Sequence, residues 1–288
     1  INHENYHPFF GDGMIHGIRV EDGKALWYKN KFVTSPFGFG PNTHVLKHGE
    51  KIYALVEGGV SPVIMDSEMN FLEEEPFPAA DNKRFTAHPK IDSDTGEMHA
   101  VSYDFGEYVN GLGQVHYVTV DSNGKLIKDQ IIETPSRPMV HDCAITKNYV
   151  LIFDLPVTFN LGRRDDDNNP IGGDYPVVWN DKHTSRVGLQ NKKTDEIIWI
   201  EVNPGFLFHI VNSYEDDNGQ VILDFCRYER LFDFDNPLPM GQKPFLTRWI
   251  LDPKTKTCSE EMLDDRPMEF SRVHPDFDGK QHLSLIHI

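Results

Sequence analysis

The sequence lacks the features that mark several common protein classes. Its three cysteines are an odd number with no C-x-x-C pair, which argues against a disulfide framework and favours a reducing compartment such as the cytoplasm or plastid stroma. No apolar run reaches the roughly 18 residues that a membrane-spanning helix needs, and the first residues show no basic-then-apolar signal pattern. Helical periodicity is nearly absent, which excludes a helical bundle.

Basic residues are also scarce. The chain of 288 residues has 28 lysines and arginines against 45 aspartates and glutamates, which gives a formal net charge of −17, and no cluster of basic residues offsets it. We therefore expect no nucleic-acid partner. This length is enough to bury a sizeable core, and we favour one large domain over two small ones.

Short β-rich runs separated by turn residues recur along the chain and predict an all-β fold with many hairpins. One expected hairpin joins the strands Val115–Val120 and Leu126–Ile132 through Asn123-Gly124. Turns at Asp22-Gly23 and Asn218-Gly219 have the same signature, because both central residues tolerate positive φ. Strands joined in this way stay antiparallel and adjacent, which is the wiring of β-propeller blades.

Three histidines lie in strand-like segments: His88 in FTAHPK (residues 85–90), His141 in VHDCAIT (140–146) and His209 in FLFHIVN (206–212). The intervals of 53 and 68 residues are too long for a zinc finger or a helical H-E-x-x-H site. They suit one metal ligand from each of several blades of a closed, radial fold. Taken alone, each histidine is more often a packed or solvated residue than a ligand.

The neighbouring residues favour a shared site. These three segments, with GDGMIHG at residues 11–17 and MEFSR at 268–272, resemble the carotenoid cleavage oxygenase family, which includes apocarotenoid- and lignostilbene-cleaving enzymes and retinoid isomerases. The matches run in family order from about residue 7 to about residue 275. The resemblance implies a seven-bladed β-propeller, of which this chain holds five or six blades, with a loop and helix cap over one face. Residues 161–175 and 232–244 are the candidate cap loops, and an ordinary exposed loop is an equally good interpretation of both.

The resemblance also implies an Fe(II) site with four histidine ligands. His88, His141 and His209 fall on the first three by motif, and the family's fourth histidine lies beyond the last residue of this chain. Glu57 and Glu269 match two glutamates that orient the ligand histidines, and a third such glutamate is expected beyond the end as well. Without the motif, Glu57 would be read as a strand-end carboxylate facing water. Asp142 is expected to form hydrogen bonds rather than to bind metal.

Oxidative cleavage of a carbon–carbon double bond by dioxygen is the activity that the resemblance implies, with two carbonyl products and a long, apolar, conjugated alkene as substrate. Lignostilbene cleavers of the family place a lysine directly before the first orienting glutamate, where this chain has Val56, so we favour a carotenoid or apocarotenoid. A retinoid-type isomerase, stilbene cleavage and a metal-free propeller binding protein remain alternatives. Peripheral contact with a membrane, the source of such substrates, is also expected.

Both ends of the chain look cut. Residue 1 is an isoleucine close to the first family motif, and residues 283–288 (LSLIHI) read as a translated sequencing adapter, so His287 is left out of the site. We therefore expect residues 1–282 to be a partial oxygenase domain, with weak or no activity on its own.

Overall fold

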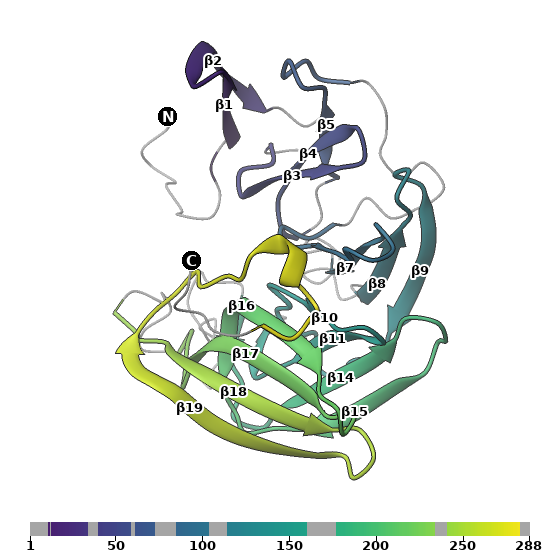
Figure 1. The fold of residues 1–288 in the computed structure, drawn as a ribbon. Helices are drawn as coiled ribbons and strands as arrows, with labels where there is room; N and C mark the ends of the chain where they lie inside the picture. Colours follow the sequence, from purple (N-terminus) through teal and green to yellow (C-terminus); the bar gives the residue numbers. More distant parts are fainter. Residues whose placement is uncertain are drawn as a thin grey trace.

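The chain folds almost entirely as β-structure (Figure 1). Within the described residues of this computed structural model, the one helical element is a short 3-10 helix, η2 (Pro275–Phe277). The expected all-β class is therefore confirmed. The structure describes residues 11, 13–33, 40–58, 61–72, 85–103, 114–159, 177–233 and 241–282.

The described strands form six antiparallel sheets, built mainly from strands that follow one another in sequence. Two small sheets begin the chain: β1 (Gly13–Glu21) with β2 (Lys24–Val33), then β3 (His44–His48), β4 (Lys51–Leu55) and β5 (Val63–Met65). The first four-stranded sheet holds β6 (Lys90–Ile91), β7 (Met98–Ser102), β8 (Val115–Val120) and β9 (Leu126–Ile132). The second holds β10 (Ala144–Ile145), β11 (Tyr149–Asp154), β14 (Arg186–Asn191) and β15 (Ile197–Glu201). Between β11 and β14 in the sequence, β12 (Val157–Phe159) and β13 (Val177–Trp179) form a separate two-stranded sheet. The third holds β16 (Phe206–Glu215), β17 (Val221–Tyr228), β18 (Phe245–Asp252) and β19 (Thr257–Pro267).

The four-stranded sheets fan outwards, with β9 and β19 on the outside and β16 nearer the middle (Figure 1). Burial follows this order, because nine of the ten residues of β16 are buried whereas no residue of the outer β19 is. Within the described part of the chain the sheets form an open arc, so the number of blades stays a prediction. Of the two expected cap loops, residues 161–175 and 234–240 lie outside the described residues.

The expected hairpins are present. Strands β8 and β9 have the predicted bounds, and β1 pairs with β2 around Asp22-Gly23, where both residues have positive φ (49° and 73°). At Asn123-Gly124 only the glycine has positive φ, 84°, and the turn is longer than two residues. Asp121 closes this turn because its Oδ1 accepts the backbone N–H groups of Asn123 and Lys125, at 2.9 and 2.8 Å.

The core connects the four-stranded sheets. One continuous cluster of buried apolar side chains extends from β7 to β18, and in it the rings of Phe225 and Trp249 lie 4.6 Å apart. All three cysteines are free thiols; Cys143 and Cys226 are buried, whereas Cys258 is only partly buried.

This core gives a stability prediction. Phe225→Ala removes a ring that is 1% exposed and leaves a cavity, so we expect the free energy of unfolding to fall by about 3–5 kcal/mol. Ile127→Ala, at a position 52% exposed on β9, should change it by less than about 0.5 kcal/mol. Urea unfolding followed by tryptophan fluorescence measures both, and similar losses in the two variants would contradict the assigned core.

Candidate metal centre

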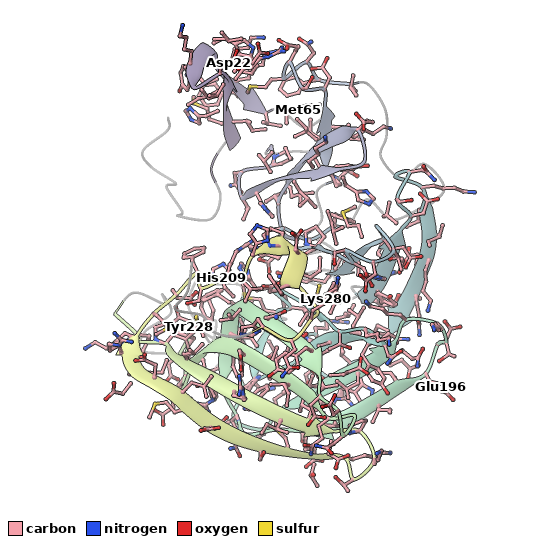
Figure 2. The ribbon with its side chains drawn as sticks, in the orientation of Figure 1. Asp22, Met65, Glu196, His209, Tyr228 and Lys280 are labelled. Carbon is pink, nitrogen blue, oxygen red and sulfur yellow. The ribbon has the colours of Figure 1, made fainter. Side chains whose placement is uncertain are left out.

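Three histidines that are far apart in the sequence lie together near the middle of the arc. The ring centroids of His88 and His141 are 4.6 Å apart, and both lie 5.2 Å from the centroid of His209, which is labelled in Figure 2. One ring nitrogen from each histidine lies within 4.8 Å of the others. The structure therefore brings together the three histidines selected from the sequence, in a group that could hold one metal ion.

Each histidine is positioned at the first strand of a different four-stranded sheet. His88 and His141 lie in non-strand backbone just before β6 and β10, not within strands as the sequence suggested. His209 lies inside β16, where the pairing with β17 shifts register between Leu207 and Ile210 and again before Asn212. Such bulges place extra residues in one strand and redirect its side chains. The irregular backbone at all three positions frees the imidazoles from the regular alternation of a strand.

A glutamate holds the outer ring nitrogen of two of these histidines. His141 Nδ1 lies 2.5 Å from Glu57 Oε2, and His209 Nδ1 lies 2.8 Å from Glu269 Oε2. With Nδ1 donating to a carboxylate, the Nε2 atom of each ring carries a free lone pair that a metal can accept. The carboxylate also fixes the plane of the ring. Glu57 and Glu269 thus each contact one of the three histidines selected from the sequence.

The glutamates are themselves anchored. The hydroxyl group of Tyr103 donates to Glu57 Oε1, and the backbone N–H of Phe270 donates to Glu269 Oε2 at 2.8 Å. Burial opposes a positive charge on His141, but the charge of Glu57 and its hydrogen bond outweigh this effect and raise the pKa of His141. Tyr103 is a residue that the sequence analysis missed, because it carries no motif signal and lies 46 residues from its partner.

His88 differs from the other two histidines and provides a test of whether the group fits a metal. It is 5% exposed, and neither ring nitrogen has a hydrogen-bond partner among the described residues. Burial, followed by repulsion from His141, lowers its pKa, so the ring is neutral. A buried polar nitrogen without a partner costs free energy, whereas coordination to a metal would satisfy it. A neutral imidazole facing two others is thus a suitable donor set for a divalent transition metal.

Aromatic rings surround this group. Phe208 lies edge-on to His141, with the centroids 5.0 Å apart, and also contacts Phe206 and Tyr228. The ring of Phe270, which is 70% exposed, stacks on His209 at 4.0 Å. The sequence showed many phenylalanines but not which of them lie at the site. Their apolar surface provides contacts for an apolar ligand beside the imidazoles.

Several other polar residues near the site or in the sheets have structural contacts. Asp142 forms hydrogen bonds, as expected, pairs with Lys90 and does not belong to the histidine group. His99 and His116 bind Tyr117 and Asp129, and His183 binds Asp154. Residues 283–288 lie outside the described residues. No helix in the described part of the chain is long and apolar enough to cross a membrane.

Comparison with known proteins agrees with this geometry. Residues 40–284 match the family model described as retinal pigment epithelial membrane protein (RPE65). The chain is 32% identical to a carotenoid cleavage oxygenase of Mycobacterium tuberculosis over 98% of its own length and 67% of that protein. It is 26% identical to the apocarotenoid-15,15'-oxygenase of Synechocystis, over 96% of the chain and 65% of that protein. The chain therefore belongs to the carotenoid cleavage oxygenase family.

Solved structures give the same fold. The chain matches cobalt-substituted Synechocystis ACO with a TM-score of 0.78 and 22% identity, covering 96% of this chain and 66% of that one. It matches the lignostilbene dioxygenase of Pseudomonas brassicacearum with a TM-score of 0.79 and 24% identity, covering 95% and 64%. The chain thus spans about two thirds of the length of these proteins.

The contact between Glu57 and His141 predicts an effect on metal affinity. We expect Glu57→Ala to weaken Co(II) binding ~10–100-fold, because the ring loses the acceptor that fixes its orientation. Glu57→Gln should weaken it less, since the amide oxygen still accepts from Nδ1. Isothermal titration calorimetry measures the affinities. Glu50→Ala, at an exposed position, is the control, and an equal loss there would show that Glu57 has no specific role.

Proposed function

We propose that this chain is the iron-binding part of a seven-bladed β-propeller dioxygenase that cleaves a carbon–carbon double bond of a carotenoid or apocarotenoid. The products are two carbonyl compounds. The observation that carries the proposal is the convergence of three largely buried imidazoles from three separate segments, two of them held by glutamates, beside aromatic side chains. Similarity to carotenoid-cleaving relatives supports the reaction class.

In this proposal His88, His141 and His209 hold Fe(II). Neutral nitrogen ligands leave the full charge of the ion and open positions around it, and bound iron would supply the activation of dioxygen. Glu57 and Glu269 keep Nδ1 of their histidines protonated, so that Nε2 always faces the metal position.

The aromatic residues would position the substrate. Phe208 and Phe270 present ring surfaces next to His141 and His209, where a conjugated chain can lie by apolar contact. Val56, directly before Glu57, is 5% exposed and cannot donate a hydrogen bond or a proton to a phenol through its side chain. An apolar polyene suits these surroundings better than a hydroxystilbene.

Metal binding is the first test of the proposed function. We expect one Fe(II) per 288-residue chain after anaerobic loading, measured by metal analysis of the desalted protein. His88→Ala, His141→Ala and His209→Ala should each lose most of it, whereas His116→Ala, which removes a partner of Asp129, should retain it. Absence of bound iron in the unaltered chain would contradict the proposed site and favour a metal-free binding protein.

The reaction is tested by product analysis. The iron-loaded chain, and beside it the complete product of its gene, are incubated with an apocarotenoid in air-saturated buffer, and the products are identified by mass spectrometry. Shorter aldehydes or ketones support cleavage, with weak activity in the 288-residue chain. Products that preserve the carbon count would instead indicate an isomerase, and selective cleavage of a hydroxystilbene would overturn the proposed substrate.

A further inference from the structure

A buried ion pair joins residues next to two of the three histidines in the sequence. Lys90 Nζ is 2.9 Å from Asp142 Oδ1 and 3.2 Å from Oδ2. The side chain of Asp142 is 2% exposed and that of Lys90 is 11% exposed. Lys90 comes two residues after His88, and Asp142 comes directly after His141, so the pair joins the segments of two histidines.

The same carboxylate reaches the third histidine segment. Asp142 Oδ2 accepts the backbone N–H of Ile210, the residue after His209, at 3.2 Å. Asp142 Oδ1 accepts the backbone N–H of Cys143 at 2.7 Å, which fixes the orientation of the carboxylate relative to its own segment. One side chain therefore contacts all three segments within two residues of each histidine.

A gain in folding stability does not by itself explain why this chain has such a buried ion pair. Removing two charges from water is unfavourable, and apolar replacements of buried ion pairs are often neutral or stabilising. A carboxylate, however, has two oxygens with several acceptor positions, so it can bind a lysine and two backbone N–H groups at once. No apolar side chain can connect three separate segments through directional bonds.

We propose that Asp142 and Lys90 are positioning residues that set the relative orientation of the three imidazoles. This inference rests on the proposed metal site and adds a role to residues that do not touch the metal position. The bond to Ile210 acts where β16 departs from regular pairing, and so it fixes the part of that strand that carries His209. Glu57 and Glu269 orient individual rings, whereas Asp142 fixes the backbone segments relative to one another.

The test measures Co(II) affinity by competition with a chelator and the visible absorption spectrum of bound Co(II), which reports ligand geometry. For Asp142→Asn we expect Co(II) affinity to fall ~10–100-fold, the usual range for groups that support metal ligands, with an altered spectrum. The double variant Asp142→Asn/Lys90→Met removes the unpaired ammonium. It should regain most of the urea midpoint lost in the single variant but neither the affinity nor the spectrum.

Asp154→Asn is the matched control. Asp154 is also buried, at 0% exposed, and it pairs with Arg186 at 2.7 Å and with His183 at 3.0 Å, with no bond to the segments of His88, His141 or His209 among the described contacts. This variant should lose stability and keep the unaltered Co(II) affinity and spectrum. A double variant with normal affinity and spectrum would overturn the positioning role while leaving the metal site intact. Absence of Co(II) binding in the unaltered chain would overturn both the site and this inference.

Discussion

The candidate metal centre depends on one geometric constraint: three imidazoles, carried by segments at the first strands of three separate sheets, must point at one position. No single strand or turn can meet it, because His88, His141 and His209 are separated by 53 and 68 residues. A radial arrangement of sheets meets it by placing the first strand of each sheet at the centre. Each histidine is then released from regular strand geometry, two just before a strand and one within a bulge.

Successive polar contacts support this arrangement: residues that bind the imidazoles are themselves bound by further residues. Glutamates hold the outer nitrogens of two imidazoles, and Tyr103 holds one of those glutamates in turn. The buried carboxylate of Asp142 bonds to a residue close to each of the three histidines in sequence and so joins their segments. Because most of these polar groups have a defined partner, the site gains directionality that apolar packing does not give. The exceptions among the described residues are Glu269 Oε1 and both ring nitrogens of His88, which could bind a metal ion.

The sequence predicted the repetitive parts of this structure well. Strands Val115–Val120 and Leu126–Ile132 were predicted at their observed bounds because a glycine turn and regular β-rich runs mark them locally. The histidines and glutamates could be selected because family motifs surround them. The bulge at His209 could not be predicted, since it depends on pairing with β17 and leaves no mark in the local sequence. The contacts of Tyr103 and Lys90 were missed for a similar reason, because they join residues 46 and 52 positions apart.

The most direct measurement for the central claim is a crystal structure of the iron-loaded chain with anomalous diffraction data collected at the iron absorption edge. We predict a single strong anomalous peak within coordination distance of His88, His141 and His209, with Nε2 of His141 and His209 facing it. A peak elsewhere, or three imidazoles that do not share one ion, would contradict the account.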